Sequence, residues 1–240
     1  SMRFTHTYSA VVCHPTRITL MTGRYPFRFG DPAWGSFPVQ AENQTFAHEF
    51  KKAGYATAVA GKWQLCMMKD EQDHPHRLGF DEYCLFGWHE GPRYHNPLIW
   101  QNGEIRKDVS DQYGPDVYSD FLIDFMARNR NNPFLAYYPM VAPHGTREGQ
   151  TTCPIYGSPG EMAGPKDDIP RRVRALNDYI DILVGRLIKK TRDLGVKEKT
   201  IFIFCSDNGT AVTAKSRGVE RGCRVPFIAY GAGIKKRGAT

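Results

Sequence analysis

The strongest constraint on the fold is a long amphipathic segment, residues 170–194, that leads into an apolar run at residues 200–205. The apolar residues of the segment recur at intervals of three and four, which is the spacing of one helix face. They are Val173, Leu176, Ile180, Leu183, Val184, Leu187 and Ile188. Gly195 supplies a stop signal for the helix. The unbroken apolar run that follows is typical of a strand covered on both faces, so this stretch predicts a layered α/β structure.

The same passage from helix to strand occurs twice earlier in the chain. A predicted helix at 45–53 precedes a strand at 55–60, and a predicted helix at 115–129 precedes a strand at 134–138. A helix that passes so directly into a strand is typical of parallel crossovers. A chain of 240 residues can bury one sizeable core. We therefore predict one α/β unit with a mostly parallel central sheet flanked by helices.

Shorter strands and loops complete the predicted architecture. Strands are expected at residues 82–86 and 225–230, and residues 4–9 predict a short strand or an extended entry to the turn at Cys13. Residues 98–105 predict a hairpin, because Asn-Gly at its centre suits a type I′ turn. Long loops at 25–41 and 65–113 are rich in turn-forming, aromatic or histidine residues. Loops of this length over an α/β core commonly shape a binding cleft.

Composition excludes several classes of protein. No apolar run approaches the length of about 18–20 residues needed for a transmembrane segment. The net charge of +7 suits an anionic substrate. The basic residues are scattered and no nucleic-acid-binding motif is present, so we expect no nucleic-acid partner. The six cysteines lie far apart without a C-x-x-C pair, which favours neither a zinc knot nor a disulfide scaffold.

A thiol lies at the predicted start of the first helix. Cys13 is followed by Pro15, which suits the first helical turn, and by the cationic Arg17. Free backbone N–H groups, the positive end of the helix dipole and a guanidinium together can seat a tetrahedral oxyanion. A buried structural cysteine is the alternative interpretation of this pattern on its own.

Three further positions carry candidate chemistry. Asp207 and Asn208 follow the strand at 200–205, where hard oxygen ligands suit Ca²⁺ or Mg²⁺, although Asp-Asn-Gly is also ordinary turn chemistry. Lys62 emerges from a predicted buried strand and either reaches solvent or faces an anion. His144 ends another strand and is a candidate acid, or a loop histidine without a catalytic part.

Five segments in order resemble the signature of the type I sulfatases, members of the alkaline-phosphatase-like superfamily. They are Cys13-x-Pro15-x-Arg17 with Thr22-Gly23-Arg24, residues 54–65, residues 133–144 ending in Ala-Pro-His, residues 206–209, and Lys215 with residues 220–226. The resemblance implies that Cys13 is converted to formylglycine by a formylglycine-generating or equivalent maturation enzyme. Its hydrate is then the nucleophile. The resemblance also implies roles for Arg17, Lys62, His144 and Lys215 in substrate binding or catalysis, and for Asp207, Asn208 and residue 13 as ligands of Ca²⁺ or Mg²⁺.

The sequence departs from the family pattern at several positions. Gln64 stands where the family has a histidine, and it can bind substrate through hydrogen bonds but cannot carry a proton at neutral pH. Arg221 replaces a glycine, and Arg217 competes with Lys215 for the sulfate-binding role. The family's first strand, which bears paired aspartates, and its C-terminal subdomain have no counterpart here. We therefore expect residues 1–240 to form a sulfatase-like catalytic domain that is incomplete at both ends.

These observations predict a sulfuric ester hydrolase of the arylsulfatase type, located in the periplasm or secreted. Its expected partner is a small-molecule or glycan sulfate ester. A phosphomonoester or phosphonate hydrolase of the same superfamily is one alternative, since both oxyanions are tetrahedral. A catalytically inactive binder of sulfated glycans is the other, motivated by Gln64 and the basic charge.

Overall fold

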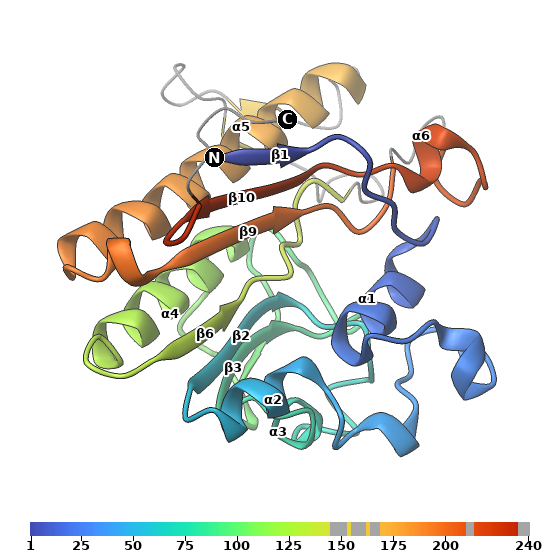
Figure 1. Ribbon diagram of the computed structural model, residues 1–240, viewed down its shortest axis with the longest axis horizontal. Helices are drawn as coiled ribbons and strands as arrows, with labels where there is room; N and C mark the ends of the chain where they lie inside the picture. Colours follow the sequence, from blue (N-terminus) through green and yellow to red (C-terminus); the bar gives the residue numbers. More distant parts are fainter. Residues whose placement is uncertain (145–152, 155–161, 164–168, 210–213, 235–240) are drawn as a thin grey trace.

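Two separate sheets carry the fold (Figure 1). The computed structural model describes residues 1–144, 153–154, 162–163, 169–209 and 214–234. The strands are β1 (Met2–Phe4), β2 (Ala56–Lys62), β3 (Glu82–Phe86), β4 (Ile99–Gln101), β5 (Glu104–Ile105), β6 (Phe134–Tyr137), β7 (Cys153–Pro154), β8 (Met162–Ala163), β9 (Ile201–Cys205) and β10 (Phe227–Gly231). One sheet has the order β5-β4-β3-β2-β6, the other β1-β10-β9, and β7 pairs with β8.

Helices cover the five-stranded sheet on both faces. They are α1 (Cys13–Thr22), α2 (Phe46–Lys52), α3 (His74–Arg77), α4 (Gly114–Arg128), α5 (Ile169–Asp193) and α6 (Glu220–Cys223), with 3₁₀ turns η1 (Pro26–Phe29), η2 (Val39–Ala41) and η3 (Lys197–Lys199). In Figure 1, α4 and α5 lie toward one side of this sheet and α2 and α3 toward the other. None of the described helices is both long and apolar enough to cross a membrane.

Strand β2 lies between β3 and β6 in the five-stranded sheet and pairs in parallel with both. Successive side chains of a strand point to opposite faces. Ala58 and Ala60 accordingly pack in the core beneath α4 and α5, whereas Val59 packs in the core that includes residues of α1 and α2. Both faces of β2 are therefore buried, as the apolar sequence predicted. The antiparallel pairs β3-β4 and β4-β5 make the sheet mixed.

Helix α4 shows why its sequence folds as it does. Pro115 occupies the first turn, where its missing N–H costs nothing. The face predicted to be apolar, which includes Phe121 and Leu122, is buried against β2 and α5. Polar contacts with α5 add to this packing. Asp116 accepts a hydrogen bond of 2.7 Å from the Tyr179 hydroxyl and pairs with Arg186 at 3.0 Å. These contacts join α4 to α5.

Several local predictions are confirmed. Thr45 caps α2 in a reciprocal capping box with His48, which starts the predicted helix. The hairpin turn has positive φ at both Asn102 and Gly103, as a type I′ turn requires. The short strand or extended entry predicted at 4–9 contains only the last residue of β1 and an isolated bridge from Tyr8 to Arg224.

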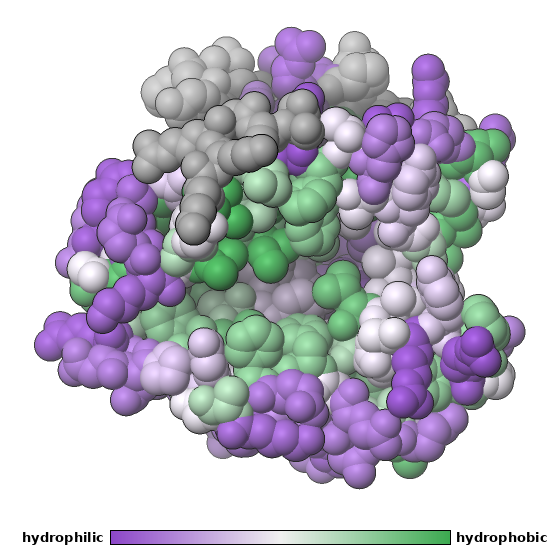
Figure 2. Space-filling view, in the orientation of Figure 1, coloured by the Kyte–Doolittle hydropathy of each residue, from purple (hydrophilic) through white to green (hydrophobic). Residues whose placement is uncertain are grey.

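The prediction that residues 200–205 are covered on both faces is wrong. Strand β9 pairs antiparallel with β10 at the edge of the three-stranded sheet, and Ile201 and Ile203 on one face are 56% and 63% exposed. Phe204, on the opposite face, packs against the core beneath α4 and α5. An apolar run shows that a strand can be buried but does not supply the layer that buries it. On the face of the molecule that is viewed in Figures 1 and 2, apolar side chains surround a hollow (Figure 2).

Candidate active site

Cys13 is the first residue of α1, and its side chain is buried with 2% exposed. Val12 before it is extended, and no side chain caps the helix. The backbone N–H groups of the first turn therefore keep their capacity to bind an anion. Pro15 falls within this turn, as the sequence predicted. The thiol thus lies at the positive end of a helix, on the inner side of the molecule.

Lys62 is the last residue of β2 and meets Cys13 directly. Its Nζ lies 3.6 Å from the Cys13 Sγ, and its side chain is buried. Gly61 has a φ of +122° and would place a Cβ 2.3 Å from the Pro139 carbonyl oxygen, so only glycine fits there. That close approach lets the Lys62 N–H donate to the same carbonyl at 2.7 Å. The Gly-Lys pair is thus what turns the end of β2 toward the thiol.

Arg17 completes a buried cationic group. It lies one turn after Cys13 and donates a hydrogen bond of 2.8 Å from its guanidinium to the Lys62 carbonyl oxygen. Its Nε is buried without a hydrogen-bond partner among the described residues. Burial first, and then the charge of Arg17, lower the pKa of Lys62 to about 7, although Cys13 and Asp207 oppose the shift. A site with two buried cations and an unsatisfied donor suits a bound anion.

Asp207 and Asn208 follow β9 and reach α1 from the other sheet. The Thr16 hydroxyl donates a 2.7 Å hydrogen bond to the Asp207 carbonyl oxygen, which fixes this turn against the first turn of α1. The Asn208 side-chain amide donates to the Gly209 carbonyl at 2.8 Å. Its Oδ1 is buried without a hydrogen-bond partner among the described residues.

A divalent cation fits the chemistry of this turn. A buried amide oxygen without a donor is costly, and Ca²⁺ or Mg²⁺ would satisfy it. The Asp207 carboxylate is the adjacent hard ligand, and its charge acts on Lys62, so the turn and the cationic group are neighbours. That Asp207, Asn208 and residue 13 share such an ion stays a prediction.

His144 joins the site through Arg93, a residue that the sequence did not single out. An Arg93 guanidinium nitrogen lies 3.0 Å from the His144 Nδ1. Because a guanidinium only donates, Nδ1 is the acceptor, and the proton of a neutral His144 ring is on Nε2. The Arg93 guanidinium also lies 5.0 Å from the centre of the Phe86 ring, and its charge acts on Lys62. No motif marks Arg93, which belongs to the long loop predicted to shape a cleft.

Lys215 and Gln64 are placed less directly. Lys215 is half-buried, and the N–H of Ser216 donates at 3.0 Å to the carbonyl oxygen of Val11, two residues before Cys13. The backbone of Lys215 is therefore beside the start of α1. Gln64 is buried with a φ of +57°, and its Oε1 has no hydrogen-bond partner in the described part of the chain.

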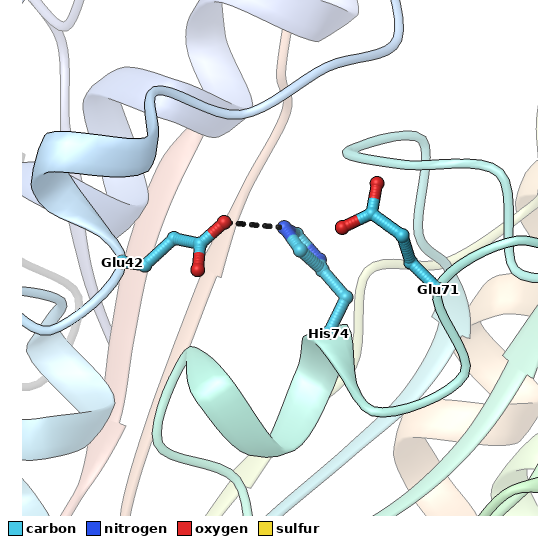
Figure 3. A group of neighbouring side chains, drawn as sticks. All are labelled: Glu42, Glu71 and His74. Carbon is cyan, nitrogen blue, oxygen red and sulfur yellow. Dashed lines mark ion pairs between the residues drawn. The ribbon is translucent and has the colours of Figure 1, made fainter.

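A second cluster, formed by Glu42, Glu71 and His74, has the residue types of a metal site but not its chemistry (Figure 3). The Trp63 indole N–H donates to the His74 Nδ1 at 3.0 Å. The proton of the neutral His74 ring must then be on Nε2, which faces Glu42, and a protonated nitrogen cannot bind a metal. Arg77 pairs with Glu42 at 2.9 Å and also with Glu71. The cluster is an ion-pair network that anchors α3.

Comparison with known proteins identifies the family of this chain. The sequence profile of the sulfatase family matches residues 1–240. This chain therefore belongs to the sulfatase family. It is 28% identical to the N-acetylgalactosamine-6-sulfatase of Homo sapiens over 94% of the chain and 46% of that protein. It is also 28% identical to the ulvan-active sulfatase of Formosa agariphila over its whole length, which is 51% of that protein.

Solved structures show the same fold. The crystal structure of Ps i-CgsB in complex with k-i-k-neocarrahexaose matches with a TM-score of 0.77 at 24% identity, over 95% of this chain and 57% of that one. The sulfatase yidJ structure from Bacteroides fragilis matches with a TM-score of 0.72 at 21% identity, over 95% and 60%. The predicted α/β core of the sulfatase type is confirmed. The chain spans about half the length of the curated relatives it matches.

Proposed function

We propose that this chain carries the catalytic centre of a sulfuric ester hydrolase. The observation that carries the proposal is the contact of 3.6 Å between the Cys13 Sγ and the Lys62 Nζ at an uncapped helix N-terminus. Both groups are buried, and Arg17 is hydrogen-bonded to the same lysine residue. A sulfate ester has the charge and tetrahedral shape that such a site would bind. Membership of the sulfatase family supports the same reaction.

In the proposed reaction, residue 13 acts as formylglycine. A maturation enzyme and an external oxidant would replace the thiol group with an aldehyde, which hydrates. One hydrate hydroxyl loses its proton to solvent as its oxygen attacks sulfur, and the bond from sulfur to the ester oxygen breaks. His144, with its proton on Nε2, is positioned by Arg93 to protonate the departing alcohol. The remaining hydrate hydroxyl then loses its proton, the carbonyl reforms and sulfate leaves, after which water restores the hydrate.

The surrounding residues supply charge. Arg17, Lys62 and Lys215 would neutralise the sulfate oxygens as the ester bond breaks. Asp207, Asn208 and residue 13 would hold Ca²⁺ or Mg²⁺, which supplies further positive charge to the sulfate when bound. Gln64 would contact the substrate by hydrogen bonding only.

The proposed substrate is a sulfate ester of a glycan. The names of two relatives, an N-acetylgalactosamine-6-sulfatase and an ulvan-active sulfatase, and the neocarrahexaose complex of a structural neighbour support this class. The basic charge of the chain also suits a polyanion. We propose a periplasmic or secreted location, where such polysaccharides occur.

Turnover by a Cys13→Ala variant tests the proposal. The protein would be co-expressed with a formylglycine-generating enzyme and assayed with 4-nitrophenyl sulfate and with ulvan and carrageenan oligosaccharides. We expect kcat to fall by about 10⁴-fold or more, with an unchanged circular dichroism spectrum. Rates equal to those of the unmodified protein would refute the assignment. Faster turnover of 4-nitrophenyl phosphate would favour the phosphatase alternative, and oligosaccharide binding without hydrolysis would favour the inactive binder.

A further inference from the structure

A cavity of about 310 Å³ opens beside the candidate active site. It is lined by Phe86, His89, Glu90, Gly91, Pro92 and Arg93. Arg93 belongs to both places, because its guanidinium also contacts the His144 Nδ1 at 3.0 Å. When the sulfate of a ligand lies at Cys13, another part of the same ligand can therefore enter the polar cavity next to Arg93.

A row of four aromatic rings runs from Cys13 to this cavity. The ring of His14, the residue after Cys13, lies 5.3 Å from that of Trp34. Trp34 lies 6.4 Å from Trp88, and Trp88 lies 4.2 Å from His89 in the cavity wall. Trp34 is 51% exposed although it contacts two other rings. The row thus connects the reacting residue with the cavity and keeps an aromatic face open to solvent.

The backbone holds these rings in place. Gly35 has a φ of +81°, and a Cβ there would lie 2.0 Å from the Trp88 ring, so the indole packs directly on the main chain. The His14 Nε2 lies 2.7 Å from the Ser36 carbonyl oxygen, which anchors the first ring of the row. The segment from Trp34 to Ser36 is therefore bound to the row at both ends. Rings fixed in this way lose little side-chain entropy when a ligand binds.

The cavity wall is equally fixed. Glu90 accepts 2.7 Å from the Trp100 indole N–H and 3.2 Å from the Lys69 N–H, so both carboxylate oxygens are engaged. Arg93 lines the same recess. Each carboxylate oxygen can accept a further hydrogen bond and a guanidinium has five N–H donors, so the hydroxyl groups of a ligand can bond to this wall whereas an apolar ligand cannot.

We propose that the aromatic row and the cavity form a subsite for the sugar ring next to the sulfated residue. A pyranose has an apolar C–H face, which can stack on an indole, and hydroxyl edges, which suit the polar recess. The site would then favour a sulfated oligosaccharide over an isolated aryl sulfate. The inference rests on the proposed function for the placement of the sulfate at residue 13.

Two substitutions test the subsite by different routes. Trp34→Ala removes an exposed ring, and Gly35→Ala displaces the Trp88 ring without removing an aromatic residue. We expect each to lower the ratio of kcat/KM for carrageenan and ulvan oligosaccharides to that for 4-nitrophenyl sulfate by about tenfold. Tyr25→Ala is the matched control, because Tyr25 is 63% exposed and contacts the Phe27 ring rather than the row. An equal loss on both substrate types would overturn the subsite.

Binding separates this inference from the proposed function. Affinities of the same oligosaccharides, sulfated and desulfated, would be measured by calorimetry in a Cys13→Ala background. Trp34→Ala should weaken binding about tenfold even where no ester is hydrolysed. If the protein hydrolyses no sulfate ester but Trp34→Ala weakens binding, the subsite stands and the proposed reaction fails. Unchanged affinity in Trp34→Ala, or no binding of any oligosaccharide, overturns the subsite.

Discussion

The two sheets contribute opposite halves of the candidate site and differ in how they are built. The five-stranded sheet carries Lys62 on β2, a strand whose neighbours bury it on both faces. The three-stranded sheet carries Asp207 and Asn208 after β9, which is exposed on one face. Figure 1 shows the two sheets converging on the side of α1. The cationic half is therefore set in a close-packed layer, and the oxygen-ligand half is set on a sheet edge.

This difference has an energetic meaning. A buried cation in a close-packed layer is unfavourable for folding, so Lys62 lowers the stability of the protein while it provides a preformed anion site. The Asp207 turn is held by hydrogen bonds, among them the Thr16 bond of 2.7 Å and the bond of 2.9 Å from the Gly209 N–H to the Gly222 carbonyl oxygen. Substitutions in the two halves should therefore separate activity from stability in different ways.

Among the substitutions that compare the two halves, Lys62→Met should have the largest effect. Removing the ammonium beside Cys13 should lower kcat/KM for a sulfate ester by about 10³-fold, which is about 4 kcal/mol. The melting temperature should rise or stay unchanged, because a desolvated charge is replaced by an apolar side chain of similar length. Steady-state kinetics measure the change in kcat/KM, and calorimetry measures the melting temperature. Loss of both activity and stability would show that Lys62 holds the fold instead.

The next prediction compares how much buried packing in each sheet contributes to the unfolding free energy. Leu122→Ala, beneath β2, should cost about 3 kcal/mol of unfolding free energy, because a buried side chain leaves a cavity. Ile203→Ala on the open face of β9 should cost about 1 kcal/mol or less. Urea denaturation of each variant measures the difference. Equal losses would mean that the open face of β9 is covered in solution.

A smaller effect should follow from Asn208→Ala. Its Oδ1 has no hydrogen-bond partner in the described residues, so the substitution should change the unfolding free energy by less than about 1 kcal/mol. If this oxygen binds a cation, the concentration of Ca²⁺ or Mg²⁺ required for half-maximal turnover should rise by about tenfold. Titration of the chelated protein with calcium or magnesium measures this concentration. An unaltered titration would remove Asn208 from the ligand set.

The last prediction concerns His74, on the α2 and α3 side of the five-stranded sheet (Figure 1). Burial, then the charge of Arg77, lowers the pKa of His74 to about 3 from 6.5, while Asp73 opposes the shift. Glu42 also faces its Nε2, at 3.8 Å. The unfolded chain takes up a proton between these values and the folded protein does not, so stability is fully present above pH 6.5 and falls by about 1.4 kcal/mol per pH unit below it.

His74→Gln should flatten this acid dependence. Glutamine keeps an acceptor for the Trp63 N–H but does not titrate. Urea unfolding of both proteins at about pH 7 and pH 5 measures the change. The variant should lose about 2 kcal/mol less than the unsubstituted protein across this interval. The same loss in both would mean that other groups control the acid response.

Local patterns predicted the parts of the molecule that depend on neighbours in sequence. The β2 strand, the α4 helix and the Asn102-Gly103 turn were all found where spacing and turn chemistry placed them. Cys13, Lys62 and Asp207 were each found at the end of a regular element, next to one another. That proximity follows from the family resemblance and not from a shared sheet edge, because Lys62 and Asp207 follow strands of two separate sheets.

The predictions that failed, and the residues that were missed, depend on contacts between segments far apart in the sequence. The exposure of Ile203 could not be known from an apolar run, because the run does not identify the covering layer. Arg93 has no motif, and its contact with His144 joins positions far apart in the sequence. The contact of Trp34 with Trp88 has the same origin. Only the folded loops bring these side chains together.

The mass of the tryptic peptide that contains Cys13 tests the central claim most directly. The protein would be purified after co-expression with a formylglycine-generating enzyme and digested under conditions that preserve aldehydes. The account predicts that the peptide loses the mass expected when a thiol is replaced by an aldehyde, and that this fraction rises together with sulfatase activity. An unmodified thiol in a preparation that hydrolyses sulfate esters would contradict it.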